Sequence, residues 1–170
     1  MFSKHSIKIN TEKRNLSRGI GLIEVVIGAS LISLSLIGIV LLAQMYTRVS
    51  RENTSKIQAS FLIEGGMEGM RSIRDRSWGE ITGLSSSTPY YLLLENNMFV
   101  ATTTAQPNID DFFERIITAD DVYRDINGDI VESGGTYDPD TKKITTTVSW
   151  EGISGLRSEN SATYIANLFE

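Results

Sequence analysis

The chain of 170 residues contains no cysteine, one histidine and three prolines. Without cysteine it has no disulfides and no thiolate metal sites. The only histidine, His5, lies in the first 19 residues, so a chain cut after residue 19 would have no imidazole for acid–base catalysis. We therefore expect a protein that is not an enzyme and that needs no cofactor.

Charge is distributed very unevenly along the chain. Residues 1–19 carry one acidic residue, Glu12, and five basic ones: Lys4, Lys8, Lys13, Arg14 and Arg18. Subtracting their formal charge of +4 from the whole-chain charge of −5 leaves −9 for residues 20–170. This bulk acidity argues against a nucleic acid as the partner of the main domain.

A run of 22 residues from Val25 to Tyr46 has neither a charge nor a proline. As a helix it would be about 33 Å long, which matches a hydrocarbon core of about 30 Å. A secretory signal peptide has a shorter apolar run, and a soluble chain of this size could not surround such a helix. We therefore predict a single membrane-spanning helix in the lipid bilayer, and the basic residues before it place the N-terminus in the cytoplasm.

Glu24 stands where this apolar run begins, and a carboxylate at the edge of a membrane helix suggests a function. The segment from Arg18 to Val25 reads Arg-Gly-Ile-Gly-Leu-Ile-Glu-Val. It resembles the processing motif of type IV prepilins and pseudopilins, in which a basic leader ends in glycine and a glutamate lies shortly before an apolar helix. Ile20 and Gly21 replace the phenylalanine and threonine that are commoner in that family.

The resemblance implies a structural subunit, a minor pilin or pseudopilin. Prepilin peptidase would cut between Gly19 and Ile20 and methylate the amine of Ile20. Glu24 would pair with the N-terminal amine, including that of a neighbouring pilin subunit. Further partners would be the inner-membrane assembly machinery, and the protein would pass from the bacterial cytoplasmic membrane into an extracellular or periplasmic filament. Secretion, adhesion, motility and DNA uptake all remain open as its use, and a membrane-tethered extracytoplasmic binding module is the alternative.

These observations divide the chain into a leader (1–19), a transmembrane or filament-core helix (20–46) and an extracytoplasmic head (47–170). We expect the helix to run from about 20 to 76, with its C-terminal half packed on an antiparallel β-sheet in an α+β, type IV pilin-like fold. An apolar stripe favours this packing or, alternatively, contact with neighbouring subunits; it comprises Ile57, Phe61, Ile63, Met67, Met70 and Ile73. Gly65, Gly66 and Gly69 indicate close packing, a bend or a break in this helix.

The rest of the head has the short apolar segments and turn residues of a sheet. We predict a hairpin of residues 90–94 and 98–103, strands at 112–119 and 143–150, and a C-terminal strand at 162–169. The last of these would place Ala162, Tyr164, Ala166 and Leu168 on one side. Asn127-Gly128 predicts a type I′ turn between residues 122–126 and 129–132.

Four head features could be mistaken for sites. Asp125, Asn127 and Asp129 have the spacing of calcium ligands but lack the glycine and the final glutamate of a calcium loop, so they remain weak candidates and a solvated turn is favoured. The segment Asp138-Pro139-Asp140 also indicates a turn. Two acidic pairs, at 110–111 and 120–121, lack a nucleophile. For Trp78, Tyr90 and Tyr91, burial is favoured over an exposed binding surface.

Overall fold

The computed structural model describes residues 20–153 and 155–168, excluding the side chain of Ile20. The helices are α1 (Ile20–Arg76) and α2 (Trp78–Thr82), and the strands are β1 (Tyr91–Glu95), β2 (Met98–Thr102), β3 (Phe113–Arg124), β4 (Ile130–Val131), β5 (Thr136–Gly152) and β6 (Gly155–Ala166). The chain divides into two compact units that meet between Thr47 and Arg48, and each is described by itself below. The predicted α+β class, with a long N-terminal helix packed on antiparallel sheet, is confirmed.

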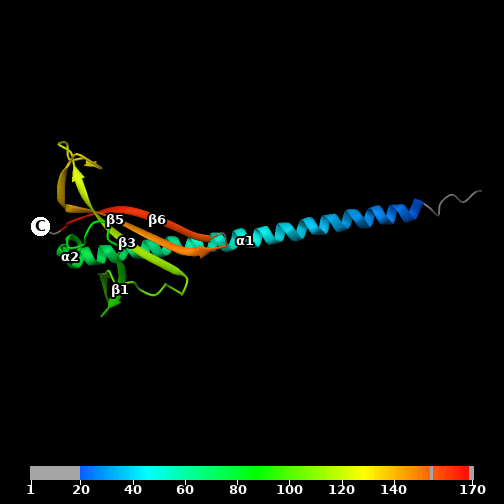
Figure 1. Ribbon diagram of the computed structural model, residues 1–170, viewed down its shortest axis with the longest axis horizontal. Helices are drawn as coiled ribbons and strands as arrows, with labels where there is room; N and C mark the ends of the chain where they lie inside the picture. The colour runs from blue at the N-terminus through cyan, green and yellow to red at the C-terminus, as the bar shows by residue number, and fades with distance from the viewer. Residues whose placement is uncertain (1–19, 154, 169–170) are drawn as a thin grey trace, which may run out of the picture. The chain divides into compact units, whose positions relative to one another are not determined.

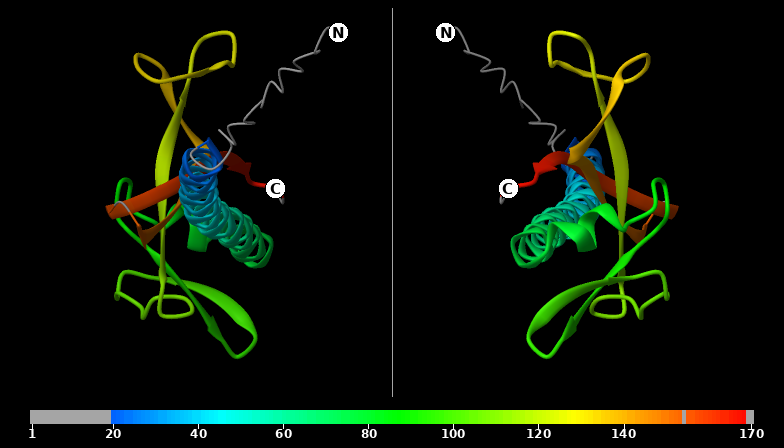
Figure 2. Two further views of the ribbon diagram at one scale, coloured as in Figure 1. Left: turned by 90° about the vertical axis from the view of Figure 1, so that its right-hand side faces the viewer. Right: turned by 90° about the vertical axis from the view of Figure 1, so that its left-hand side faces the viewer.

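The larger sheet of the head is antiparallel and has the strand order β4-β3-β5-β6 (Figure 1). Its strands β3 and β5 pair from Phe113–Trp150 to Asp121–Lys142, and β5 pairs with β6 over the whole length of β6. A separate hairpin of β1 and β2 is joined to β3 by a bridge between Tyr90 and Ile117. Figure 2 shows the head end-on, with the part of α1 that belongs to it lying along one side of the strands.

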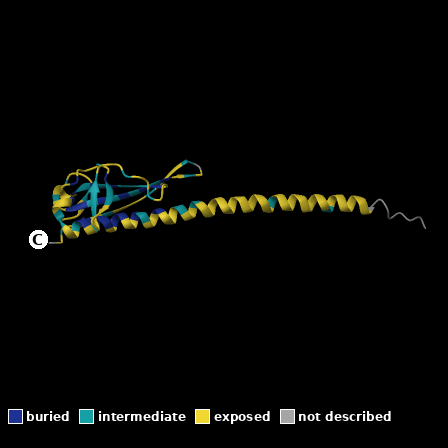
Figure 3. Ribbon diagram, turned by 90° about the horizontal axis from the view of Figure 1, so that it is seen from below, coloured by how far each residue is buried: buried dark blue, intermediate teal, exposed yellow. Residues whose placement is uncertain are grey.

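The head has its core between α1 and the inner face of the larger sheet. On β5, every second residue from Ile144 to Trp150 is buried, and the residues between them are partly exposed. This is the alternation predicted for residues 143–150. Across from it, Met70 and Ile73 of α1 are buried in the same cluster as Ile144. Figure 3 shows this buried side of α1 beneath the sheet.

Gly65, Gly66 and Gly69 of α1 lie where the helix packs on the head, and the helix continues through them to Arg76. A Cβ built on Gly66 would lie 2.7 Å from Thr146 Cγ2, and one on Gly69 would lie 2.6 Å from Leu92 Cδ1. Both distances are shorter than ordinary contacts. Close packing, rather than a bend or a break, is therefore the reason for these two glycines. Gly65 differs, since its nearest neighbour, Arg115 Nη1, would be 3.6 Å away.

Several predicted elements are confirmed and two are merged. The helix ends at Arg76, within the predicted range, and is followed by the unpredicted α2. The β1–β2 hairpin is where it was expected, and its turn residues Asn96 and Asn97 have φ of +49° and +64°. Residues 112–119 and 122–126, predicted as separate strands, largely form the one continuous strand β3.

The type I′ turn was predicted at the wrong dipeptide. Positive φ at both central residues defines that turn, and Asn96-Asn97 has it, whereas in the Asp125–Asp129 loop only Gly128 is positive, at +86°. The amide of Gly128 donates to the carbonyl of Asp125 at 3.1 Å, so this loop is a type I turn followed by a left-handed glycine. The connection at 125–129 carries the chain from β3 into the short β4.

The predicted shared side of Ala162, Tyr164, Ala166 and Leu168 is the solvent side, and the turn predicted at 138–140 is wrong. On β6 the buried side chain is Ile165, whereas Tyr164 is 49% exposed and Leu168 61%, so the face of Tyr164 is outside. The aromatic ring follows the pattern of an apolar face, but its register opposite Lys143 puts it on the solvent side. The segment Asp138-Pro139-Asp140 is part of β5 and lies at a bulge. Asp121 of β3 pairs with Lys142, but the next residue, Val122, pairs with Asp138. Proline has no N–H to donate, and an unpaired bulge tolerates that loss.

Candidate assembly helix and head surfaces

The unit that ends at Thr47 contains the apolar part of α1, whose described side chains are exposed. Its large apolar side chains from Leu22 to Tyr46 are 54–76% exposed. By length and composition α1 contains a stretch that could cross a membrane, and among the described residues it is the one helix that could. Exposure of so much contiguous apolar surface identifies a segment that lipid or other protein chains cover.

The serine hydroxyls in this stretch are satisfied within the helix. The hydroxyls of Ser30, Ser33 and Ser35 each donate to the carbonyl four residues earlier, at 2.7, 2.8 and 2.8 Å. In a hydrocarbon environment such a bond removes the cost of an unpaired hydroxyl. The serines therefore do not interrupt the apolar character of the segment.

Glu24 lies in the second turn of α1 with its side chain exposed. It forms no ion pair with any other residue in the described part of the chain. Ile20 is the first residue of α1, and residues four apart share a face of a helix, so Glu24 lies on the face that begins with Ile20. Gly19 lies outside the described residues, and the predicted cleavage and methylation remain predictions.

The predicted apolar stripe of α1 divides into two faces in the head. Ile63, Met67, Met70 and Ile73 are buried against the sheet, which confirms the packing interpretation for these four. Ile57 and Phe61 are 57% and 67% exposed instead. Phe61 is nine residues from Met70, and nine steps of about 100° place it on the opposite side of the helix. Ile57 and Phe61, one turn apart, therefore form an outward apolar patch that periodicity alone assigned to the core.

The calcium candidates form a hydrogen-bonded turn. Asp125 Oδ1 accepts from the backbone amides of Asn127 and Asp129, both at 2.9 Å, and Oδ2 accepts from Asn127 Nδ2 at 3.2 Å. The hydrogen bond from the Asp129 amide is the main cause of a lowered pKa of the Asp125 carboxyl. Within the described ranges no group of three or more His, Cys, Asp or Glu residues is arranged to hold a metal ion. The structure thus accounts for these residues as a turn.

The acidic pairs have separate structural roles. Asp110 and Asp111 occupy a turn with φ of +53° and +55°. Asp120 accepts hydrogen bonds from the amide and hydroxyl of Ser87, at 2.8 and 3.2 Å. Asp121 points to the other face of β3 and pairs with Lys142 Nζ at 2.6 Å. The adjacent residues of β3 therefore point in opposite directions, as predicted for neighbours on a strand.

Lys142 is an interior cation that the sequence did not indicate. Its side chain is 3% exposed, and Nζ contacts the carbonyl of Leu84 at 3.4 Å in addition to Asp121. The Lys142 ammonium lowers the pKa of the Asp121 carboxyl through their hydrogen bond. A lysine beside another lysine and four threonines in a strand gives no signal of burial; only the pairing of β3 with β5 places it opposite an aspartate.

The aromatic residues near the end of α1 pack within the head. Tyr90 is buried, and its hydroxyl accepts from the Ser85 amide at 2.9 Å. Trp78 packs against the main core cluster, and its indole Nε1 donates to the carbonyl of Pro139 at 3.3 Å. Tyr91 is half-buried, and its hydroxyl lies 3.3 Å from Glu114 Oε1. The favoured interpretation of burial is confirmed for Trp78 and Tyr90.

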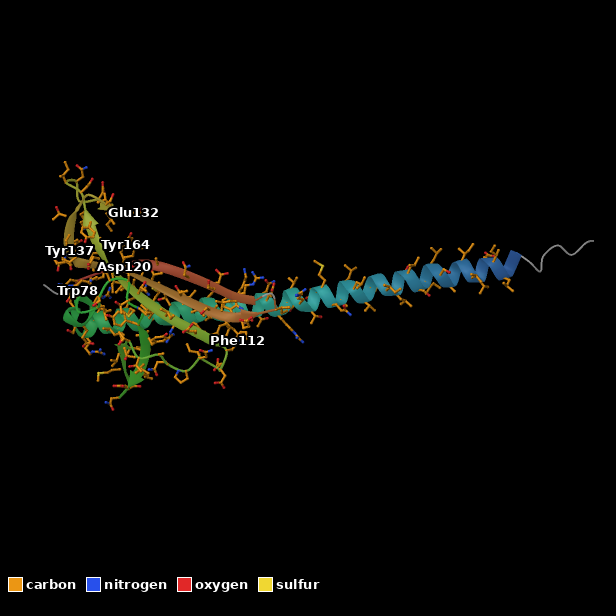
Figure 4. The ribbon with its side chains drawn as sticks, viewed as in Figure 1. Trp78, Phe112, Asp120, Glu132, Tyr137 and Tyr164 are labelled. Carbon is orange, nitrogen blue, oxygen red and sulfur yellow. The ribbon has the colours of Figure 1, made fainter. Side chains whose placement is uncertain are left out.

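The outer face of the sheet carries a shallow cavity of about 450 Å³ at the end of the head that is distant from Phe112 (Figure 4). Its polar lining includes Asp120 of β3, Glu132 just after β4, Lys143 of β5 and Tyr164 of β6. Lys143 lies opposite both Asp120 and Tyr164 in the strand register, so the three side chains form a row across the sheet. Carboxylates, an ammonium and a phenol together can hydrogen-bond a polar ligand.

We compared the chain with known protein families, curated proteins and solved structures. No protein-family model, no curated protein and no solved structure matches the chain significantly.

Proposed function

We propose that this protein is a structural subunit, a minor pilin or pseudopilin, of a type IV pilus or a type II secretion-like filament. After processing by prepilin peptidase, it would leave the cytoplasmic membrane and join the filament through its apolar N-terminal helix. The head would be displayed outside the cytoplasm. The protein would act by assembly and would catalyse no reaction.

One observation carries this proposal: the two parts of α1 have opposite surroundings. Up to Tyr46 its apolar side chains are exposed, whereas from Ala59 to Ile73 its apolar side chains are largely buried by the head's own sheet. An exposed apolar segment with no charge between Val25 and Tyr46 suits a bilayer before assembly and packing among like helices afterwards. The motif around Gly19, Ile20 and Glu24 supplies the processing step.

The cleavage chemistry of the motif gives a reason for the carboxylate of Glu24 at this position. Cutting the Gly19–Ile20 bond creates a cationic amine at the start of an apolar helix, where an isolated charge is costly. Glu24 is the nearest acidic residue and makes no ion pair within the described part of the chain. Pairing it with the amine of a neighbouring subunit would neutralise both charges and set the register between adjacent helices.

The exposed patch of Ile57 and Phe61 supports the same function. It faces away from the head's core, on the part of α1 that the head covers only from one side. A second copy of this chain could bury both side chains by packing its own helix there. The assembly surface would then extend from the apolar segment into the head.

The test is mass analysis of the protein extracted from membranes, with and without a co-expressed prepilin peptidase. We expect a new terminus at Ile20 carrying one N-methyl group, and no such product with a peptidase inactivated at its active site. An unprocessed chain beside an active peptidase, shown to cut a known prepilin in the same cells, would refute the proposal.

The second candidate is a membrane-tethered binding module, and the cavity lined by Asp120, Glu132, Lys143 and Tyr164 is the observation that favours it. Substitution of Glu24 separates the two functions. A filament subunit with Glu24→Ala should still be cleaved but should be lost from filaments, whereas a tethered module should bind its ligand unchanged. Glu24→Asp, which keeps the charge, should restore part of the incorporation.

A further inference from the structure

An apolar groove lies at the end of the head that is nearest in sequence to the membrane segment. It has a volume of about 430 Å³. One wall is formed by α1 residues between Ser50 and Ser55, and the other by Phe112 and the segment 150–153, in which Trp150 and Ile153 are apolar and Glu151 is acidic. All of these residues belong to the unit that begins at Arg48.

Large apolar side chains are exposed to solvent on and beside the second wall of the groove. Phe112 is 39% and Ile153 51% exposed, and Leu156, beyond the turn from β5 to β6, is 75% exposed. Phe112 lies in the loop before β3, Ile153 in the β5–β6 turn and Leu156 at the start of β6, where Gly155 is the register partner of Gly152. Loop tips on a soluble surface are usually polar, so three large apolar residues at one end of the head indicate a surface that something covers.

The groove cannot be far from the bilayer once the apolar segment is inserted. Ser50 follows Tyr46, the last residue of the uncharged run, by four residues. Even a fully extended chain of four residues reaches only about 14 Å, and the headgroup layer on each side of a bilayer is about 5–8 Å thick. This limit holds whatever the orientation of the head.

Charge on the α1 wall suits the same neighbour. Arg48 and Arg51 are exposed and form no ion pair with other described residues, whereas Glu52 is paired with Arg157 at 3.6 Å. Two unpaired arginines stand here in a region that is otherwise acidic, since residues 20–170 carry a formal charge of −9. Arginine beside aromatic and aliphatic side chains is the composition that binds a membrane interface, with the cation on lipid phosphate and the apolar groups below it.

We infer that this groove docks the head onto the lipid bilayer before the subunit enters a filament. Phe112, Ile153 and Leu156 insert at the level of the headgroups, and Arg48 and Arg51 contact lipid phosphates. The inference rests on the proposed membrane-inserted form and adds a second, reversible contact to it. Docking holds the head in one orientation on the membrane, and entry into the filament requires its release.

The two tryptophans make this contact measurable in the full chain. Trp150 lines the groove, whereas Trp78 and the groove residue Phe112 lie at opposite ends of the head (Figure 4). Trp78→Phe leaves Trp150 as the only reporter, and Trp150→Phe leaves Trp78. Each protein is inserted into vesicles of phosphatidylcholine and phosphatidylglycerol with or without bromine on the acyl chains, since bromine quenches tryptophan only at close range.

We expect brominated lipid to quench Trp150 and to leave Trp78 unchanged. Adding Phe112→Ser and Ile153→Ser should lower the ratio of docked to undocked heads about tenfold, because each side chain loses the gain from burial. Leu94→Ser is the control, since it replaces a large apolar side chain that is 63% exposed on the β1–β2 hairpin and should change nothing. Circular dichroism verifies that each variant is folded.

Three outcomes would overturn the inference. Equal emission of Trp150 in brominated and plain vesicles, from protein that floats with them, would refute docking and leave the filament proposal intact. Self-association of the chain that Phe112→Ser and Ile153→Ser abolish, without bromine quenching of Trp150, would assign the groove to a second copy of this chain. Protein that does not float with the vesicles would refute membrane insertion and the docking inference together.

Discussion

The two parts of α1 both carry large apolar side chains, but those side chains are exposed in the first part and largely buried in the second. Leu34 and Ile37 lie in the uncharged segment and are 67% and 58% exposed, whereas Met70 and Ile73 are 0% and 1% exposed. Neither helical propensity nor hydropathy distinguishes these residues. What separates them is the sheet that follows in the chain, which covers only the later part. The exposed part is therefore free to use its surface between molecules, and the buried part stabilises the head.

The largest expected loss of stability comes from truncating a side chain in the buried part of α1. Met70→Ala removes a fully buried side chain from the main core cluster and should destabilise the head by about 2–5 kcal/mol. Ile37→Ala removes a similar volume from the exposed part and should leave unfolding of the head unchanged. Urea titration followed by the fluorescence of Trp78, which packs against that cluster, measures both. Equal losses of stability in the two variants would show that the parts are not independent.

The next effect concerns the interior pair of Asp121 and Lys142. Asp121→Asn leaves a lysine with 3% exposure and no counter-charge, and should cost about 2–3 kcal/mol. Lys142→Met should cost less, since the remaining Asp121 side chain is 35% exposed and water can solvate it. Urea midpoints for both variants test this order. A larger loss for Lys142→Met would mean that the methylene packing of the lysine matters more than its charge.

The same pair predicts a dependence on pH. The pKa of Asp121 is lowered in the folded head from its ordinary value of 3.8 by the hydrogen bond from Lys142. Its contribution to the free energy of unfolding is therefore present above about pH 4 and is lost as the pH falls through the lowered pKa. Urea midpoints of the parent chain should fall between about pH 5 and 3. Asp121→Asn should reduce this fall but not abolish it, because Asp138 also has a lowered pKa and is hydrogen-bonded to Arg124.

Much of the secondary structure could be predicted because its signals are local. The end of α1, the β1–β2 hairpin and the alternation in β5 follow from breakers, turn residues and period-two patterns that each act within a few residues. The motif around Gly19 and Glu24 is also local. It gives the processing hypothesis without any knowledge of the fold.

What could not be predicted depends on pairing between distant segments. The alternation at 162–168 predicts that Tyr164 shares a side with Leu168, but only the register opposite Lys143 shows that this side is the outer one. Lys142 became an interior cation through its position opposite Asp121. Phe61 fitted the apolar stripe of α1, although only the placement of the sheet decides which side of that helix is covered.

Neighbouring glycines offer a finer comparison on one turn of α1. Gly66→Ala should destabilise the head by about 1 kcal/mol, because its Cβ would lie 2.7 Å from Thr146 Cγ2 and the strain outweighs the gain in helix propensity. Gly65→Ala meets nothing closer than Arg115 at 3.6 Å and should stabilise the head by up to about 1 kcal/mol. Thermal unfolding measures the two signs. Adding Thr146→Ser removes the obstructing methyl group, and failure to relieve the Gly66→Ala defect would refute the steric cause.

The smallest expected effect lies at the exposed ion pair between α1 and β6. Lys56 Nζ lies 3.4 Å from Glu159 Oε1, and their side chains are 57% and 43% exposed. Water and salt screen such a pair, so a double-mutant cycle of Lys56→Ala and Glu159→Ala should give a coupling of at most about 0.5 kcal/mol, which vanishes at high salt. A coupling above about 1 kcal/mol that persisted at 1 M salt would contradict this expectation. It would mean that charge on β6, and not only the buried face of α1, fixes the helix against the sheet.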